Sequence, residues 1–283
     1  MKLLTTHLLA VLLVTIFSAT NQLYAQENPE EKFGWKLGSQ AYTFNRFTFL
    51  EALDKIDSCG LKYVEGFPGQ TIGGDIEGKM DFKMEPAKRE QILKKLKEKG
   101  IKMVAFGVIN ANSDEDWEKL FQFAQAMGLD NITSEPKESD LPLLSKLCDK
   151  YKINIAIHDH PNPSHYWNPD IVIAAMKGQS SRIGACADIG HWVRSGLDPI
   201  ECLKKLEGHI KGLHLKDLNE KSKTAHDVPW GTGVSNVQGV LSELKRQKFK
   251  GVISAEYEYN WLNSAPEVAL SAKNVREMVT KMK

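Results

Sequence analysis

The most constraining feature of the sequence is a regular alternation, after Lys36, of short apolar runs with longer amphipathic stretches. Eight of the apolar runs have the length and composition of buried strands: residues 37–42, 62–66, 102–108, 131–134, 154–157, 183–187, 210–215 and 252–255. Parallel strands need a crossover connection, which is usually a helix. The alternation therefore predicts an α/β protein with a parallel sheet.

Local signals mark where the intervening helices begin. Pro86 heads one helix, and Ser113 followed by three acidic residues opens another. Asn168-Pro169 and Asp198-Pro199 each combine a capping residue with proline at the first helical position, and Ser264 with Glu267 predicts a capping box for the last helix. Eight strand–helix units predict a single (β/α)₈ TIM barrel. The alternative, an open doubly wound sheet, lacks the Gly-rich turn expected after its first strand.

The loops that follow the strands are longer and more distinctive than those that enter them. Residues 67–85 are rich in glycine, residues 158–168 hold three histidines, and residues 216–234 contain His226 and Trp230. In an α/β barrel these loops form the active-site face. We therefore expect a site at the carboxyl ends of the strands.

The N-terminus reads as a targeting segment rather than as part of the domain. Lys2 precedes an apolar run over residues 8–17, and Ala25 offers a small residue at a cleavage point. A membrane anchor needs about 20 apolar residues, whereas this run is broken from Ser18 onwards. We predict a cleaved signal peptide over residues 1–25, a barrel domain over residues 26–283, a periplasmic or secreted protein, and no stable membrane span after cleavage.

The net charge bears on the kind of binding partner, and the cysteines bear on disulfide formation. Without residues 1–25 the chain carries 36 basic and 36 acidic residues, which argues against a nucleic-acid partner. The four cysteines, Cys59, Cys148, Cys186 and Cys202, are scattered and show no C-x-x-C spacing. Two disulfides would be compatible with an oxidising compartment, but the positions favour buried free thiols.

Metal-capable side chains gather at the predicted strand ends of the second half. Apart from His7, every histidine lies at or after position 158. Asp188 ends the sixth strand, His214 lies near the end of the seventh, and Glu256 ends the eighth. Mixed carboxylate and imidazole ligands suit a hard or borderline divalent cation. Three adjacent strands thus predict a metal site at one rim.

These motifs resemble a known family. Asp-x-x-His at the sixth strand, His-x-Lys-Asp at the seventh and Glu-Tyr at the eighth are similar to those of the xylose-isomerase-like TIM-barrel superfamily, also called sugar phosphate isomerase/epimerase. The resemblance runs from about residue 37 to the C-terminus. It implies that Asp188, His214 and Glu256 are three of four metal ligands, and that a homodimer is a common state.

The fourth ligand of the family is a glutamate at the end of the fifth strand, where this chain has His158-Asp159-His160. Here His158 takes the glutamate position and His160 matches the usual histidine. Glu135, at the end of the neighbouring fourth strand, offers a replacement carboxylate. We therefore predict Glu135, Asp188, His214 and Glu256 as ligands, with His158 as a fifth or alternative ligand. Mn²⁺ is the preferred metal, with Zn²⁺, Co²⁺ or Mg²⁺ as alternatives.

Further residues are candidates for chemistry and substrate binding. The resemblance places His191 and Lys216 near substrate oxygens, Glu65 at a polar substrate-binding position, and Glu256 as a base. His160 is a second candidate base. Tryptophans in loops of the same face, whose rings suit sugar rings, were expected to line the site: Trp167, Trp192, Trp230 and Trp261. Trp192 and Trp230 are the predicted substrate contacts among them.

Together these features predict an exported, metal-dependent carbohydrate enzyme of the isomerase/epimerase type, acting on a sugar or keto-sugar by proton abstraction beside a metal-bound oxygen. Because a histidine replaces one glutamate, a lyase or dehydratase acting on a keto-glycoside or keto-polyol is an alternative. A non-catalytic exported sugar-binding module is an alternative of another class. A DNA-repair role as in endonuclease four is disfavoured, since residues 26–157 contain no histidine.

Overall fold

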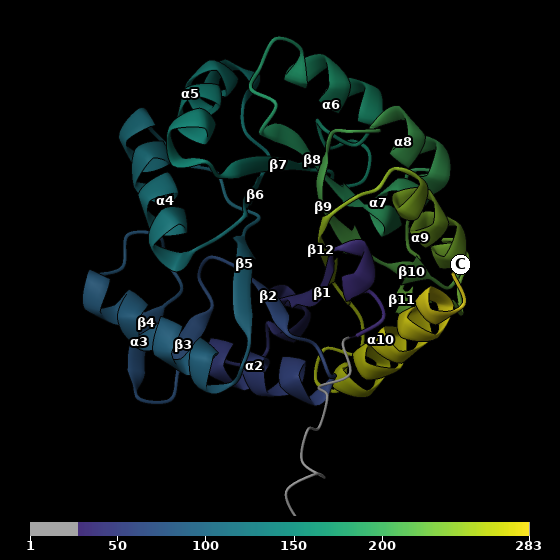
Figure 1. Ribbon diagram of the computed structural model, residues 1–283, viewed down its shortest axis with the longest axis horizontal. Coiled ribbons are helices and arrows are strands. Elements are labelled where there is room, and N and C mark those ends of the chain that lie inside the picture. Colours follow the sequence, from purple (N-terminus) through teal and green to yellow (C-terminus); the bar gives the residue numbers. More distant parts are fainter. Residues whose placement is uncertain (1–27, 283) are drawn as a thin grey trace, which may run out of the picture.

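The computed structural model describes residues 28–282 and shows a closed barrel of eight parallel strands (Figure 1). β1 pairs with β12 on one side and β2 on the other, so the sheet has no open edge, and the doubly wound alternative is wrong. The single TIM barrel is confirmed. In sequence order the barrel strands are β1 (Trp35–Gln40), β2 (Tyr63–Gly66), β5 (Lys102–Phe106), β6 (Asn131–Ser134), β7 (Asn154–His158), β8 (Ile183–Asp188), β9 (Ile210–Leu215) and β12 (Gly251–Ala255).

A ring of helices surrounds the barrel (Figure 1). Their apolar faces pack on the outside of the strands in one large core. α10 closes the ring, because it contacts both α2 and α9. The helices are α2 (Phe49–Ser58), α3 (Pro86–Glu98), α4 (Asp114–Met127), α5 (Leu141–Tyr151), α6 (Pro169–Met176), α7 (Ile189–Arg194), α8 (Pro199–Lys205), α9 (Val237–Arg246) and α10 (Ala265–Thr280).

Most of the expected helix starts are present. The side chain of Ser113 accepts a hydrogen bond from the backbone N–H of Asp116 at the start of α4, and Asn168 and Asp198 cap α6 and α8 in the same way. These caps satisfy N–H groups that have no partner inside the helix. The expected helix starts at these three positions are confirmed.

One predicted cap is wrong. Ser264 has helical backbone angles and makes no side-chain bond to the first turn of α10; its hydroxyl instead donates to the carbonyl of Thr43, 3.4 Å away. A capping box exists elsewhere, at α2, where Thr48 and Glu51 bond reciprocally. A serine followed three residues later by a glutamate is a valid capping signal, but here the Ser264 hydroxyl bonds the chain segment after β1 instead of the first turn of α10.

The chain segments after the strands carry extra structure on the mouth side of the barrel. The predicted first strand stops at Gln40, and its last two residues enter the short 3-10 helix η2 (Ala41–Phe44). The loop after β2 forms a hairpin of β3 (Thr71–Gly73) and β4 (Ile76–Lys79), and the loop after β9 forms β10 (Asp217–Leu218) and β11 (Asp227–Val228). Two further 3-10 helices are η1 (Glu31–Phe33) and η3 (Glu138–Asp140).

Two other expectations concern export. All four cysteines are buried and free, as predicted. The proposed signal peptide lies outside the described residues. Across residues 28–282, the helices are all too short or too polar to cross a bilayer.

Candidate metal centre

Four ionisable side chains converge where β7, β8, β9 and β12 end. His158 and Asp188 are the last residues of β7 and β8, His214 is the last but one of β9, and Glu256 directly follows β12. The register places Asp188 beside His214, and His214 beside Ser254. All four side chains are buried. Parallel strands therefore bring these groups to one rim, as the sequence predicted.

One atom of each of these four side chains is buried: His158 Nε2, Asp188 Oδ2, His214 Nδ1 and Glu256 Oε2. The two imidazole nitrogens make no hydrogen bond within the described residues, whereas the two carboxylate oxygens are ion-paired with the ammonium of Lys216. Asp188 Oδ2 lies 3.7 Å from His158 Nε2 and 3.9 Å from His214 Nδ1, and the latter lies 3.1 Å from Glu256 Oε2. A buried polar atom without a partner costs about 1–3 kcal/mol. A divalent cation among the four atoms would give both imidazole nitrogens a partner and would take the place of the ammonium at the two carboxylates, so the residues fit a metal.

A glutamate lies behind each of the two imidazoles. Glu65 Oε2 is 2.9 Å from His214 Nε2, and Glu135 Oε1 is 3.0 Å from His158 Nδ1. A carboxylate on the outer ring nitrogen holds the proton there and leaves the lone pair of the inner nitrogen free for a metal. The same arrangement on both sides of Asp188 supports two oriented imidazole ligands.

Two predicted roles change because of this arrangement. Glu65 was expected to contact substrate, but it is 1% exposed and lies behind His214, so that expectation is wrong. Glu135 was expected to bind the same metal as Asp188. Its carboxylate instead lies on the outer side of His158, and His158 itself faces Asp188.

Glu135 belongs to a second group of metal-capable atoms. Together with His158 and His160 it offers ligand atoms within 4.8 Å of one another. Its carboxylate hydrogen-bonds His160 as well as His158, and Ser164 donates to it from 3.3 Å. Burial alone would raise the pKa of Glu135, but the hydrogen bonds from the two histidines lower it to about 2. Glu135 is therefore ionised at neutral pH, and its carboxylate positions both imidazoles.

Asp188 is held so that only one of its oxygens faces the centre. Its Oδ1 accepts the backbone N–H of His191 at 2.8 Å and so caps α7. The backbone N–H of Asp188 donates to Asp159 Oδ1, also at 2.8 Å. Asp159 is 3% exposed and did not stand out in the sequence. These bonds fix the direction of the carboxylate and leave Oδ2 for a cation.

Lys216 is the positive charge already present at the centre. Its side chain is fully buried, and Nζ lies 3.1 Å from Asp188 Oδ2, 2.8 Å from Glu256 Oε2 and 2.6 Å from Glu258 Oε2. Burial alone would lower the pKa of Lys216, but these carboxylates raise it well above its usual value. Gly190 makes room for this side chain, since a Cβ there would meet the Lys216 Cβ at 2.7 Å.

His191 lies at the edge of the centre, with Nε2 3.6 Å from Asp188 Oδ2. It also belongs to a metal-capable group with His158, Asp188 and Glu256. However, Arg194 approaches His191 Nδ1 at 3.2 Å, and an arginine N–H can only donate. The ammonium of Lys216, also a donor only, lies 3.5 Å from the other ring nitrogen, Nε2, so cationic groups face both sides of the ring. His214, whose outer nitrogen is held by Glu65, is the better oriented second imidazole ligand. Burial lowers the pKa of His191 well below its usual value, consistent with a neutral ring.

Sequence reasoning missed the residues that hold this edge in place. Arg194 also contacts Asp227 Oδ2 at 3.4 Å and Glu258 Oε2 at 3.5 Å. Glu258 could have been found, because it follows Glu256 by two positions and alternate residues of an extended segment share a side. Asp227 could not have been found in this way, since the β10–β11 hairpin brings it in.

The two tryptophans predicted to contact substrate do not reach the mouth. Trp192 and Trp230 are each 1% exposed and belong to the main apolar core. The indole N–H of Trp230 donates to the carbonyl of Leu215, and Ser271 of α10 contacts its backbone. Both predictions are wrong, because both indole rings are buried in the main apolar core. His160, whose side chain is 50% exposed, is the predicted catalytic residue most open to solvent.

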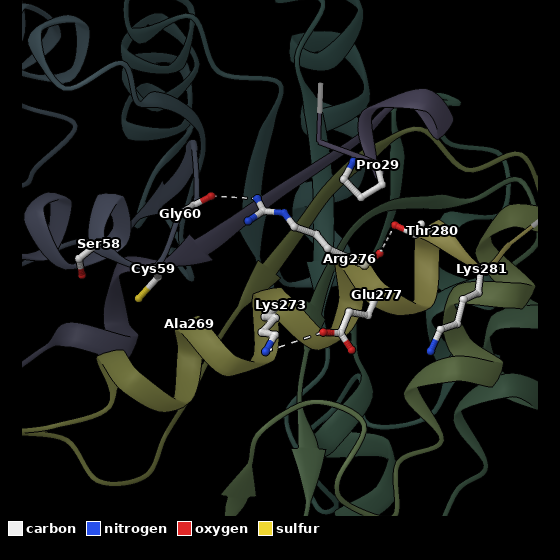
Figure 2. A pocket seen from close by; sticks show the side chains of 10 residues that line it. All are labelled: Pro29, Ser58, Cys59, Gly60, Ala269, Lys273, Arg276, Glu277, Thr280 and Lys281. Atoms are coloured by element: carbon white, nitrogen blue, oxygen red, sulfur yellow. Dashed lines mark hydrogen bonds and ion pairs between the residues drawn. The ribbon is translucent and has the colours of Figure 1, made fainter. Parts of the chain in front are cut away.

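A large hollow of the surface lies away from this chemistry. It has a volume of about 650 Å³ and lies between the end of α2 and α10, where Figure 2 shows Cys59, Lys273 and Arg276. Arg276 is already bound to Glu30 and to the carbonyl of Gly60. No residue of the metal centre lines this hollow. Its size therefore does not make it the functional site.

The comparisons with known proteins agree with the fold. The chain is 26% identical over 178 residues to inosose dehydratase of Bacillus cereus (strain AH820), covering 57% of this chain and 54% of that protein. The chain thus spans about half the length of the curated relatives it matches.

Solved structures match over a larger part of the chain. An uncharacterised protein from Parabacteroides distasonis ATCC 8503 is 37% identical, with a TM-score of 0.72, over 86% of this chain and 99% of that one. A xylose isomerase-like TIM barrel protein from Mycobacterium smegmatis, solved in complex with magnesium, is 12% identical with a TM-score of 0.68, over 87% of this chain and 97% of that one.

The sequence model described as "Xylose isomerase-like TIM barrel" matches residues 53–278, which include all the strands that carry the metal centre. The predicted resemblance is therefore confirmed: the chain belongs to the xylose isomerase-like TIM barrel family.

Proposed function

We propose that this protein is an exported, divalent-metal-dependent carbohydrate enzyme that removes a proton beside a metal-bound oxygen of a sugar or keto-sugar. The observation that carries the proposal is the convergence of four buried ligand atoms, on His158, Asp188, His214 and Glu256, of which the two imidazole nitrogens make no hydrogen bond within the described residues. The family membership supports it, because isomerase, epimerase and dehydratase names recur among the relatives.

The types of ligand atom limit which metal ions the site would prefer. Two imidazoles and two carboxylates suit borderline cations such as Mn²⁺, Zn²⁺ or Co²⁺, whereas Mg²⁺ prefers oxygen ligands. We propose Mn²⁺ as the first choice. When bound, the metal would act as a Lewis acid that stabilises negative charge on a substrate carbonyl or hydroxyl oxygen.

The chain itself supplies the proton-transfer groups. His160 is half-exposed at the mouth and hydrogen-bonded to the Glu135 carboxylate, which is the arrangement of a supported general base. Glu256 is the alternative base, although Lys216 and His214 hold it as an anion within the centre. On the other side, the ammonium of Lys216 can protonate an oxygen that acquires charge, and the imidazole of His191 can hydrogen-bond it.

The same groups favour a dehydratase or lyase as the second candidate. A two-base epimerase needs a proton acceptor on each face of the substrate, whereas here His158 takes the position of the second glutamate. Elimination needs one base and one acid: His160 or Glu256 removes the proton, the C–O bond breaks, and Lys216 protonates the leaving oxygen while His191 hydrogen-bonds it. The similarity to inosose dehydratase supports this version.

The experiment that tests the proposal has two readouts. Purified protein without residues 1–25 is analysed for bound metal, and then incubated with Mn²⁺ and either free ketoses or 3-keto-glycosides. Isomerised or epimerised ketose supports the first version, and an unsaturated product with a released alcohol or sugar supports elimination. Metal binding with no turnover of either substrate class would contradict both versions and would leave a sugar-binding module.

The Glu256→Gln variant separates an enzyme from a binding module. Turnover should be lost in this variant, whereas a module without catalysis should bind its sugar as before. Export is tested separately, by sequencing the N-terminus of the protein recovered from the periplasm or medium of expressing cells; a start at Gln26 is expected. An intact N-terminus on intracellular protein would contradict export.

A further inference from the structure

The ammonium of Lys216 has three carboxylate partners, two of which are candidate metal ligands. Its side chain is fully buried, and Nζ lies 3.1 Å from Asp188, 2.8 Å from Glu256 and 2.6 Å from Glu258. Three carboxylates match the three N–H groups of an ammonium. Glu258 is the partner that the metal centre does not use. Because a buried charge without a partner is strongly destabilising, the ammonium needs Glu258 whenever a cation is bound at Asp188 and Glu256.

The charges of the centre balance when Glu258 is paired with Lys216. As metal ligands the two imidazoles are neutral, so Asp188 and Glu256 supply two negative charges, which a divalent cation neutralises. The ammonium is then left as a further positive charge beside that cation. Glu258 supplies the matching negative charge, and its oxygen is the one that lies nearest to Nζ.

The surroundings of Glu258 hold its carboxylate in place. Its backbone N–H donates to Asp227 Oδ2 at 3.1 Å, and its Oε2 lies 3.5 Å from Nη1 of Arg194. Arg194 in turn pairs with Asp227 Oδ2 at 3.4 Å. The backbone N–H of the preceding residue, Tyr257, donates to the hydroxyl of Thr43 at 2.9 Å. The segment after β12 is therefore fixed on two sides, and the Glu258 carboxylate remains at the centre.

The stem of Lys216 is held as well. A Cβ at Gly190 would lie 2.7 Å from the Lys216 Cβ and 3.0 Å from its Cδ, so the backbone of α7 packs directly against this stem. The freedom to move is thus left to the end of the side chain. A rotation there takes Nζ away from Asp188 and Glu256 and keeps it beside Glu258.

We propose that Glu258 is a positioning residue, which holds the Lys216 ammonium at the centre once Asp188 and Glu256 have bound a divalent cation. The inference rests on the proposed function and deepens it, since it accounts for a metal ion and a general acid in one site. In the metal-free protein the ammonium bridges all three carboxylates. In the metal-bound protein it keeps Glu258, and its other N–H groups are free for a substrate oxygen.

The metal affinity of Glu258→Gln tests this role without turnover. The amide keeps the size of the side chain but loses its charge, so the ammonium of the metal-bound protein loses its remaining carboxylate. Mn²⁺ affinity, measured by competition with a chelator of known affinity, should fall about 10- to 100-fold. Glu220→Gln, an exposed carboxylate between β10 and β11, is the matched control and should bind Mn²⁺ as wild type does.

A second pair of variants shows whether Glu258 acts through the ammonium. In Lys216→Met there is no ammonium to hold, so adding Glu258→Gln should leave the Mn²⁺ affinity of Lys216→Met unchanged. An equal loss of affinity with and without Lys216 would show that Glu258 acts on the metal through its own charge, and would overturn the proposal. Wild-type affinity in Glu258→Gln would overturn it too.

Thermal unfolding gives a readout that does not depend on the Lys216 variant. Metal-free Glu258→Gln keeps Asp188 and Glu256 at the ammonium, so its melting temperature should stay near that of wild type, whereas the rise on adding Mn²⁺ should be smaller. A lower metal-free melting temperature with an unchanged rise would mean a purely structural role and would overturn the proposal. Absence of Mn²⁺ binding by wild type would overturn the proposed function as well, whereas the other contrary results leave that function standing.

Discussion

The carboxylate of Glu65 lies 2.9 Å from Nε2 of His214, although the two residues are 149 positions apart in the chain. The pair spans the inside of the barrel from β2 to β9. Its effect is to leave His214 Nδ1 facing Asp188 and Glu256. A matching pair, Glu135 with His158, does the same from the other side. Two oriented imidazoles are the basis of the predictions that follow.

Removing the charge behind His214 should weaken metal binding. In Glu65→Gln the side chain keeps its size and an acceptor oxygen but loses its negative charge, so the inner nitrogen becomes a poorer ligand. We expect metal affinity to fall about 10- to 100-fold, measured by competition with a chelator of known affinity. Glu201→Gln on the exposed face of α8 is the control and should leave affinity unchanged. Equal affinities for Glu65→Gln and wild type would contradict the orienting role.

Lys216 should stabilise the metal-free protein, and its ammonium should compete with the metal for Asp188 and Glu256. Lys216→Met leaves the carboxylates of Asp188, Glu256 and Glu258 without their ammonium partner. We expect the metal-free variant to lose about 3–5 kcal/mol of stability, as for other buried charges that lose a partner. Added Mn²⁺ should then raise its melting temperature by more than that of wild type.

Thermal unfolding with and without Mn²⁺ measures this effect. Lys204→Met, which removes a half-exposed ammonium from α8, serves as the control. A variant of Lys216 that responds to Mn²⁺ no more than wild type would show that the ammonium and the metal do not share Asp188 and Glu256.

His191 should serve the reaction and not the metal. In His191→Asn the imidazole at the edge of the centre is lost, whereas His158, Asp188, His214 and Glu256 remain. We expect unchanged metal affinity and a fall in kcat of about 10²- to 10⁴-fold. Loss of the metal together with activity would instead place His191 among the ligands.

Asp227 should make stability depend on pH. Burial raises its pKa to about 7, although Lys216 and Arg194 oppose the shift. The unfolded chain releases this proton near pH 4, whereas the folded chain keeps it to about pH 7. The stability of the wild type relative to Asp227→Asn should therefore fall as pH rises between these values, by about 1.4 kcal/mol per unit, and level off above.

Urea denaturation of both proteins from pH 5 to pH 8.5 checks the prediction for Asp227. Changes in other ionisable groups cancel in the difference between the two proteins. A difference that stays constant from pH 5 to pH 7 would show that the folded carboxylate titrates at its ordinary value.

The sequence was sufficient for the barrel and for the rim that carries the centre. Periodic apolar runs located all eight barrel strands to within about two residues, because each strand is buried on both faces. Asp188, His214 and Glu256 were found because parallel strands must end at one rim. His158 was recognised as well, but only the structure shows that it, and not Glu135, faces Asp188.

The features that the sequence did not predict depend on side-chain orientations, which are set by tertiary packing and not by neighbouring residues in the chain. Glu65 looks like a mouth residue in the chain, and only the packing of the barrel interior turns it toward His214. Trp192 and Trp230 lie in segments that follow strands, yet both rings are buried in the main apolar core. Arg194 and Asp227 meet only because the β10–β11 hairpin folds over α7. Each error is one of side-chain direction rather than of position along a strand.

A crystal structure of the Mn²⁺-soaked protein, with anomalous diffraction recorded at the manganese edge, tests the metal centre most directly. We expect one strong anomalous peak within bonding distance of His158 Nε2, Asp188 Oδ2, His214 Nδ1 and Glu256, with Lys216 displaced from the two carboxylates. A peak between Glu135 and His160, or no peak among the four strand-end residues, would contradict it.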